Sequence, residues 1–226
     1  YRFSSNKKQK VLRALPSESQ QQLIRVVKPG IDVNRFYSGS KVENIQVRAK
    51  LGLPSESVIW LFVGRFVHAK GLFYLLDALE LSSDENILVM VGEGDLKASL
   101  NQYIMQRELQ QRVLFFKKVL NVEEFYRASD VFVMSSSYEP FGQTIIEASA
   151  CGLPIAAFSE VSGAITATHE LSLDFAVSYA DSLTGRSLSA AISRALVVSS
   201  DKANCDNSKR THDLFSWDVL LKNLLI

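Results

Sequence analysis

The chain has 226 residues, of which 47% are apolar and 22% are charged, a balance typical of soluble globular proteins rather than of disordered ones. This length is enough for one good-sized hydrophobic core or for two small ones. Lys and Arg total 25 against 24 for Asp and Glu, so the charge gives no electrostatic reason to expect nucleic acid as a partner.

The first 29 residues differ in pattern from the rest of the chain. A polar helix is predicted around residues 9–22, interrupted by Pro16, and a short strand at 24–28 ends at the turn signal Pro29-Gly30. The chain also starts without a Met, which indicates a fragment. We interpret residues 1–29 as the remnant of a preceding domain and its linker.

From residue 30 onward, short apolar runs alternate with longer segments of helical periodicity. The runs predict strands at residues 58–63, 87–91, 113–116, 131–134 and 154–158, and their continuous apolar character indicates burial on both faces. Helices are predicted between them at 70–80, 95–108, 122–128 and 142–150, most clearly from Leu72, Leu75, Leu76 and Leu79. This alternation predicts an α/β fold, a Rossmann-like doubly wound parallel β-sheet flanked by helices.

The C-terminal part of the pattern is weaker. Residues 183–200 have small and apolar side chains at helical spacing, residues 199–209 are predicted to form a polar loop, and residues 217–226 are strongly amphipathic. We therefore predict one domain over residues 30–214, followed by a separate terminal helix within residues 215–226.

The cysteines and the length of the apolar runs indicate the cellular setting of the protein. Cys151 and Cys205 have no Cys or His partner at ligand spacing, so neither a disulfide framework nor a zinc site is predicted. Cys151 lies in an apolar run and is expected to be buried, and a reducing, cytosolic setting follows. The longest apolar stretch, residues 58–63, is far too short to cross a bilayer.

Candidate site residues follow the predicted strands, because doubly wound sheets bind ligands at the carboxyl ends of their strands. Residues 58–63 are followed by Gly64 and Arg65, and Lys70-Gly71 then opens a helix. A guanidinium and an ammonium beside the free N–H groups of a helix N-terminus suit a diphosphate. The alternative is that Arg65 and Lys70 are solvated loop charges.

A later strand end carries two carboxylates, Glu139 in a loop and Glu147 in the following helix. Carboxylates suit sugar hydroxyls, because each oxygen accepts a hydrogen bond and a vicinal diol can be held at two points. Phe141-Gly142 lets the backbone approach a ligand closely, and the helix start at residues 142–144 offers N–H donors. Glu147 lies among apolar neighbours, so a ligand or a cation is expected beside it rather than solvent.

These segments resemble a known family. Glu139-Pro140-Phe141-Gly142 with Glu147-Ala148 is similar to the E-x7-E signature of retaining glycosyltransferases of family four, which have the GT-B architecture. Further segments of the family pattern occur in the right order over roughly 200 residues, which is far more specific than one motif. They are Lys28-Pro29-Gly30-Ile31-Asp32, Arg35-Phe36, Val63-Gly64-Arg65, Lys70-Gly71, Val91-Gly92-Glu93-Gly94, Ala128-Ser129-Asp130-Val131, Cys151-Gly152-Leu153-Pro154 and Phe215-Ser216-Trp217.

The resemblance implies that residues 30–214 form a nucleotide-sugar donor-binding domain, the C-terminal half of a GT-B fold. It implies catalytic roles for Arg65 and Lys70 on the donor diphosphate and for Glu139 on the transferred sugar. Glu147 would accept hydrogen bonds from the ribose, and the loop after residue 91 and the strand end near residue 117 would flank the nucleobase. The remaining substrate-binding candidates are Gly64, Glu93, Lys117, Phe141, Gly142, Gln143 and Thr144.

The implied activity is transfer of a hexosyl group from a UDP- or GDP-linked sugar to a glycan or lipid-linked acceptor, with retained configuration, as in polysaccharide or lipopolysaccharide biosynthesis. No metal and no cofactor besides the donor are expected, since the two cations would take the metal's electrostatic task. The resemblance favours a cytoplasmic protein or one peripheral on the cytoplasmic membrane face, with membrane contact only through the missing N-terminal half. This fragment alone is expected to show no transfer.

In the family the terminal helix crosses back to the other domain, so its apolar residues should be incompletely covered here. They are Trp217, Leu220, Leu221 and Leu224.

The chain also departs from the family pattern. Lys117 stands where the family usually has Gly, and Thr166 lies near the place of an expected Glu, so no role is assigned to Thr166. His68 is expected to face solvent, with contact to phosphate as the alternative. Two other functions stay open, namely a nucleotide-sugar-binding module without turnover and a nucleotide-sugar epimerase of the same architecture.

Overall fold

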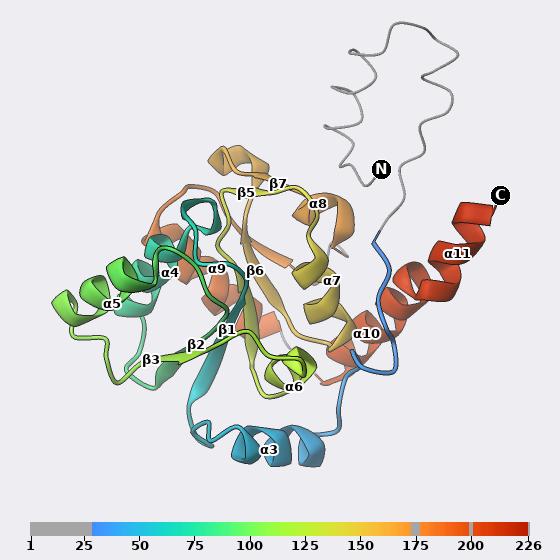
Figure 1. Cartoon of the computed structure of the whole chain (residues 1–226), viewed down its shortest axis with the longest axis horizontal. Coiled ribbons are helices and arrows are strands. Elements are labelled where there is room, and N and C mark those ends of the chain that lie inside the picture. The colour runs from blue at the N-terminus through green and yellow to red at the C-terminus, as the bar shows by residue number, and fades with distance from the viewer. Residues whose placement is uncertain (1–28, 173–176, 199–200, 226) are drawn as a thin grey trace, which may run out of the picture.

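The computed structural model describes residues 29–172, 177–198 and 201–225 of the chain. Within these ranges a parallel sheet of six strands has the order β3-β2-β1-β4-β6-β8 (Figure 1). The strands are β1 (Val58–Val63), β2 (Asn86–Val91), β3 (Val113–Phe116), β4 (Val131–Met134), β6 (Ile155–Phe158) and β8 (Val177–Ala180). The order runs from β1 to one edge and from β4 to the other, as in doubly wound nucleotide-binding sheets. The predicted fold class is confirmed.

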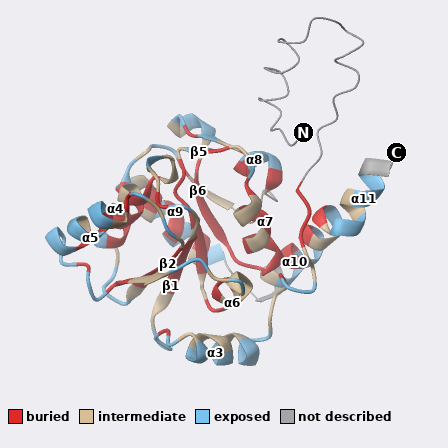
Figure 2. Ribbon diagram, in the orientation of Figure 1, coloured by how far each residue is buried: buried red, intermediate tan, exposed pale blue. Residues whose placement is uncertain are grey.

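The predicted strands coincide with β1, β3 and β4 and differ by one residue at the start of β2 and of β6. Alternate residues of a strand point to opposite faces of a sheet, and both faces are covered by helices here. Ile59 and Leu61 of β1 therefore pack into one core, while Trp60 and Phe62 pack into the other. Buried residues run along the inner strands β1, β2, β4 and β6 (Figure 2), whereas the edge strands β3 and β8 are mostly of intermediate burial.

Helices cover both faces of the sheet (Figure 1). One face carries α4 (Leu72–Glu80), α5 (Lys97–Gln106) and α9 (Gly185–Val198). The other carries α6 (Val122–Arg127), α7 (Gln143–Ala150) and α10 (Asp201–Phe215). The loops at the carboxyl ends of the strands hold the 3-10 turns η1 (His68–Lys70) and η2 (Glu160–Ser162), the short helix α8 (Thr168–Leu171), and a parallel two-stranded ladder of β5 (Tyr138–Glu139) with β7 (Ile165–Thr166).

The polar loop predicted for residues 199–209 is wrong from residue 201 onward, where α10 begins. Apart from Phe215 at its C-terminal end, the buried residues of α10 are small and polar, namely Asn207, Ser208 and Thr211, and the helix packs against α7. The Ser208 hydroxyl donates to the Ala150 carbonyl at 2.5 Å. Polar side chains that find partners can be buried at little cost, and such a helix lacks the apolar stripe that reveals one in sequence.

Strand β8 and the helix α3 (Lys41–Lys50) were not predicted, and neither were the short elements β5, β7, η2 and α8. No residue of α3 is buried, so it has no apolar stripe. Its start does carry a signal, because Ser40 accepts from the backbone N–H of Glu43 while the Glu43 carboxylate accepts from that of Ser40. This Ser-x-x-Glu capping box is readable in the sequence.

The predicted helix at 9–22 and strand at 24–28 lie outside the described residues. Residues 30–36, which we call the linker from here on, contact the C-terminal helices α10 and α11 (Trp217–Leu225). The Ile31 N–H donates to the Phe215 carbonyl at 2.7 Å, and a side chain at Gly30 would meet the Trp217 ring at 2.5 Å. The predicted domain boundaries at residues 29/30 and 214/215 remain predictions.

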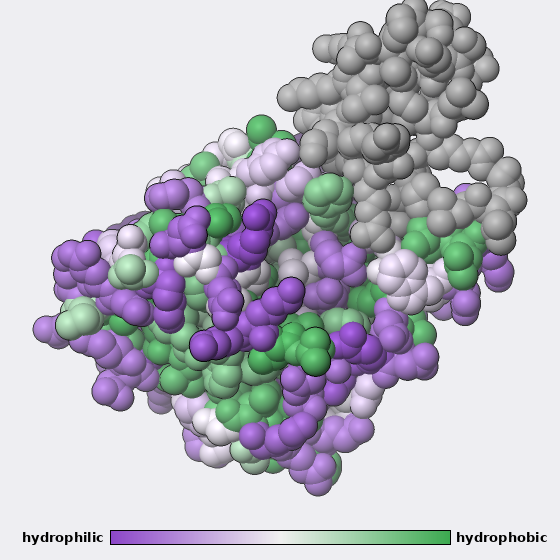
Figure 3. All heavy atoms as spheres, in the orientation of Figure 1, coloured by the Kyte–Doolittle hydropathy of each residue, from purple (hydrophilic) through white to green (hydrophobic). Residues whose placement is uncertain are grey.

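Helix α11 is incompletely covered, as expected. Trp217 and Leu221 are 48% and 53% exposed, and Figure 3 shows hydrophobic atoms at the surface over this helix. Leu220 is half-buried against Gly30, and the side chain of Leu224 lies outside the described part of the structure.

Candidate functional site

The strand order reverses between β1 and β4, and the loops that follow these two strands meet at the carboxyl edge of the sheet. The Ser137 N–H donates to the Ala69 carbonyl at 3.0 Å, and the buried Ser135 hydroxyl donates to the Lys70 carbonyl at 2.8 Å. At Gly71, where φ is 61°, a methyl group would lie 2.0 Å from the Ser135 carbonyl oxygen. Only glycine combines this left-handed conformation with so close a backbone approach. The contacts fix where Lys70 stands.

Lys70 and Glu139 form an ion pair across this junction, and both side chains are largely buried at 16% and 11% exposure. The second Glu139 oxygen accepts from the backbone N–H groups of Phe141 and Gly142, both at 3.2 Å. Burial tends to raise the pKa of Glu139, but the hydrogen bond and charge of Lys70, with the two N–H donors, hold that pKa below its ordinary range. The structure thus brings together two predicted catalytic residues.

Gly64, Arg65 and Glu93 lie in the neighbouring loops after β1 and β2. These loops are also joined through backbone, since the Phe66 N–H donates to the Glu93 carbonyl at 2.8 Å and a methyl at Gly92 would lie 2.0 Å from the Gly64 carbonyl oxygen. The side chains of Arg65 and Glu93 are exposed. His68 is exposed as well, which agrees with the solvent-facing position expected for it.

Glu147 lies on α7 and is mostly buried, as its apolar neighbours predict. Its Oε2 accepts from the Tyr126 hydroxyl at 2.9 Å, and the Gln143 side chain provides a second hydrogen bond. Burial raises the pKa of Glu147 to about 7, although Tyr126, Gln143 and the charge of Arg35 each favour the ionised form. The hydrogen-bond partners of this carboxylate are thus a tyrosine and a glutamine, whereas the sequence led us to expect a ligand or a cation.

The start of α7 faces the linker. The Gln143 amide donates to the Gly30 carbonyl at 3.2 Å, so this predicted substrate-binding residue also ties the helix to the linker. The Thr144 hydroxyl is buried and has no hydrogen-bond partner within the described ranges. Phe141 is exposed beside it. The helix start therefore retains the Thr144 hydroxyl as a polar group that a ligand can use.

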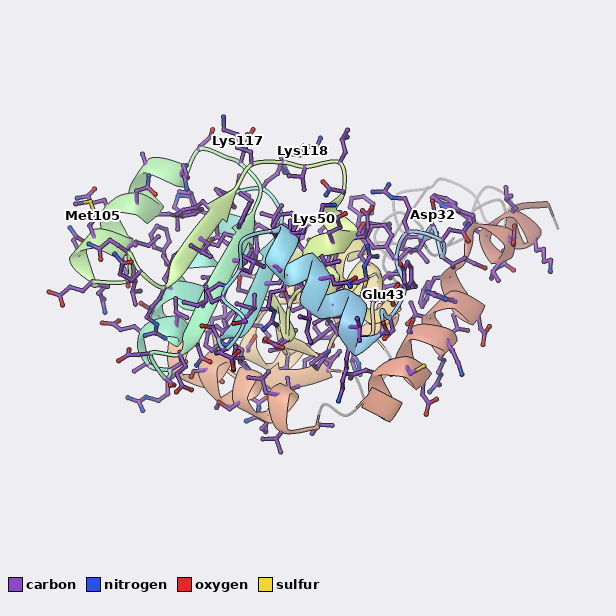
Figure 4. The ribbon with its side chains drawn as sticks, turned by 90° about the horizontal axis from the view of Figure 1, so that it is seen from below. Asp32, Glu43, Lys50, Met105, Lys117 and Lys118 are labelled. Carbon is purple, nitrogen blue, oxygen red and sulfur yellow. The ribbon has the colours of Figure 1, made fainter. Side chains whose placement is uncertain are left out.

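Lys117 lies after β3 and stands apart from this cluster. Figure 4 shows Lys117 and Lys118 projecting outward from their loop, and both are exposed. The same loop is held from the linker, because Arg35 donates to the Leu120 carbonyl and to Glu123, each at 2.6 Å. Arg35 was noted only as part of a motif, and the structure places it between this loop and Glu147.

A cavity of about 1450 Å³ lies at the opposite, amino-terminal edge of the sheet, between α3 and the start of α10. Its walls include Cys151, which is buried as predicted, and Arg48, whose guanidinium is held by Asp130 at 2.9 Å. The cavity contains none of the predicted site residues. The candidate site is therefore the loop cluster at the carboxyl edge.

Within the described residues, no three His, Cys, Asp or Glu side chains converge as a metal site requires. No helix there is both long enough and apolar enough to span a bilayer.

The sheet order and the loop cluster define a doubly wound α/β domain with a polar site at its topological switch point. Residues 43–171 match the family model described as glycosyl transferases group 1. The chain belongs to this family, which confirms the resemblance read from its sequence motifs.

Individual relatives agree with this assignment. An uncharacterized glycosyltransferase of Methanocaldococcus jannaschii is 33% identical over 137 residues, which is 58% of this chain and 35% of that protein. Anabaena HepE, solved in complex with UDP and glucose, has a TM-score of 0.83 at 19% identity and covers 99% of this chain and 61% of its own. The C-terminal domain of a group 1 glycosyl transferase from Francisella tularensis has a TM-score of 0.64 at 22% identity, covering 82% and 96%. The chain spans about a third of the length of the curated relatives it matches.

Proposed function

We propose that this chain is the donor-binding part of a retaining glycosyltransferase, which transfers a hexosyl group from a nucleotide sugar to a glycan or lipid-linked acceptor. The observation that carries the proposal is the Lys70–Glu139 pair at the switch point, with Arg65 in the same loop as Lys70 and the buried Glu147 on the helix that follows Glu139. The family assignment supports it, as does the fold shared with HepE, whose structure contains UDP and glucose.

In this proposal each residue acts on a different part of the donor. Lys70 and Arg65 bind the diphosphate and stabilise the negative charge that grows as the bond from the sugar C1 to the phosphate oxygen breaks. An acceptor hydroxyl oxygen forms the new bond to C1, and its proton passes to the departing diphosphate. Glu139 lies beside the sugar whose anomeric carbon becomes cationic. Glu147 holds the ribose, which does not change during the reaction.

The ion pair of Lys70 with Glu139 affects how Lys70 can bind the donor. Lys70 is paired with Glu139 before any donor is present, so a diphosphate has to share the ammonium with the carboxylate. An ammonium has three N–H donors and can serve both. Residues 30–214 are proposed as the donor domain, and the acceptor is proposed to bind outside this chain, in the cytoplasm or at the cytoplasmic face of a membrane.

The test is a calorimetric screen of the 226-residue chain against UDP-, GDP- and ADP-linked hexoses. One class is expected to bind, and Lys70→Met is expected to abolish its binding. Lys209→Met, which changes an exposed lysine on α10 outside the cluster, should leave binding unchanged. Absence of binding by every nucleotide sugar would overturn the proposal. The chain alone is expected to transfer no sugar, because half the cleft that orients the reactants lies elsewhere. Measured transfer would refute that part.

A further inference from the structure

Tyr126 on α6 is fully buried, and its hydroxyl contacts the candidate site at Glu147. The hydroxyl donates to Glu147 Oε2 at 2.9 Å. Its ring packs edge-on against Phe36 of the linker, with centroids 6.0 Å apart, and obliquely against Phe132 of β4 at 5.6 Å. A ring held on two sides by other rings has one orientation, so the hydroxyl is a fixed donor.

This donor removes freedom from Glu147. A glutamate side chain loses rotamer entropy when it is ordered, and a binding residue that is already ordered avoids this cost on binding. The Gln143 amide restrains the same carboxylate and is itself tied to the Gly30 carbonyl at 3.2 Å. Glu147 is thus held by α6 on one side and by its own helix and the linker on the other.

Several titratable groups face Glu147. Tyr126 and Glu123 come from α6, Arg35 from the linker, and Cys151 from the end of α7. Burial raises the pKa of Glu147 to about 7, Tyr126 and Arg35 oppose that rise, and Glu123 adds to it. Burial also raises the pKa values of Tyr126 and Cys151, so both stay neutral in the range where Glu147 titrates. Removing the Tyr126 hydroxyl would therefore shift Glu147 toward its neutral form.

We propose that Tyr126 is a positioning residue of the donor site, whose hydroxyl holds the Glu147 carboxylate ready to accept hydrogen bonds from both hydroxyls of the donor's ribose. The inference rests on the proposed function and names a residue that acts only through Glu147. Its chemical basis is that an ionised carboxylate accepts at both oxygens, whereas a protonated one has to donate at one of them.

The test compares Tyr126→Phe with the wild-type chain in two measurements. The first is the dissociation constant for UDP, GDP and ADP, by calorimetry between pH 6 and 9, using whichever binds wild type most tightly. The second is the titration of the Glu147 carboxyl carbon by NMR without ligand. Tyr103→Phe is the matched control, since Tyr103 donates to the Asp77 carboxylate on the opposite face of the sheet.

For Tyr126→Phe we expect binding about tenfold weaker at pH 7, as for a lost hydrogen bond to a charged group, with a smaller deficit at pH 9. The Glu147 titration should move to higher pH. Tyr103→Phe should match wild type in both measurements. Phe fills the volume of the Tyr ring, so packing should be retained. A second comparison controls for any packing loss: in a chain that carries Glu147→Gln, adding Tyr126→Phe should cause no pH-dependent loss of nucleotide affinity.

The outcomes separate the two proposals. If no nucleotide binds wild type, the proposed function fails and this inference fails with it. If a nucleotide binds and Tyr126→Phe binds it as wild type does across the pH range, only the inference is overturned. An equal loss at every pH with an unmoved Glu147 titration overturns it too, because that pattern indicates a packing role.

Discussion

Glu147→Gln is expected to stabilise the folded chain at neutral and alkaline pH while weakening the proposed site. Gln has nearly the same shape as Glu, and its side-chain oxygen can still accept from the Tyr126 hydroxyl, so packing and this hydrogen bond are retained. What the substitution removes is a charge that is mostly buried. Binding residues are often placed at such a cost to stability.

The magnitude follows from the pKa of Glu147, which burial raises from 4.5 to about 7. Between these two pH values the folded chain binds more protons at Glu147 than the unfolded chain does, so the free energy of unfolding falls as pH rises. The loss is complete above the folded pKa and amounts to about 3 kcal/mol. At pH 5 the carboxyl is protonated in the folded state, so most of this cost is absent.

The assay is urea and thermal unfolding of both chains from pH 5 to pH 8. The variant should be within about 1 kcal/mol of wild type at pH 5 and about 3 kcal/mol more stable at pH 8. For a chain of this length, the difference at pH 8 corresponds to a midpoint roughly 5–10 °C higher. A variant that is less stable than wild type at pH 8, or a difference that does not change with pH, would refute the reasoning.

Other expectations concern the remaining site residues. Glu139→Gln should change stability in the opposite direction, because the pKa of Glu139 is held low in the folded state. The ionised carboxylate therefore stabilises the folded chain above its unfolded pKa, and this stabilisation is lost as the pH falls through its folded pKa. The variant should be less stable than wild type at pH 7 and approach it below pH 4, and equal stability at pH 7 would contradict this. Gly71→Ala should lower the free energy of unfolding by about 2 kcal/mol or more, because of the left-handed conformation and the contact with Ser135. Unchanged unfolding curves would show that the two loops are not in close contact at Gly71. In a longer form of the protein that transfers sugar, Arg65→Ala or Lys70→Ala should lower kcat by about a hundredfold, while Glu147→Ala should chiefly raise KM, by about 1–3 kcal/mol. Steady-state kinetics that reverse these effects would show the roles to be wrongly assigned.

Much of the fold was predictable from local pattern. The runs at residues 58–63, 113–116 and 131–134 are strands with the predicted bounds, because strands covered on both faces are apolar at every position. Helix α10 was not predictable in this way, since its buried residues before Phe215 are the polar Asn207, Ser208 and Thr211, and Ser208 finds its partner on α7. Helix α3 was within reach, because its Ser40 and Glu43 capping box stands in the sequence.

The candidate site likewise has a part that local sequence pattern predicts and a part that it does not. Arg65, Lys70, Glu139 and Glu147 were identified from residue type and from their positions after predicted strands. The ion pair of Lys70 with Glu139 joins residues 69 positions apart, and Tyr126 meets Glu147 from another helix. Neither contact has a local signal, so neither was expected.

The sequence by itself determined the fold class, the family and the edge of the sheet where chemistry-bearing residues gather. Those features depend on periodicity and on the ends of strands, which are properties of neighbouring residues. Only the tertiary structure decided which charges meet and which are buried. The low pKa of Glu139 and the raised pKa of Glu147 have opposite signs although both residues are glutamates eight positions apart. The difference arises because the Lys70 ammonium pairs with Glu139, whereas no cation pairs directly with Glu147 among the described residues and burial outweighs its hydrogen bonds. That environment exists only once the loops have come together.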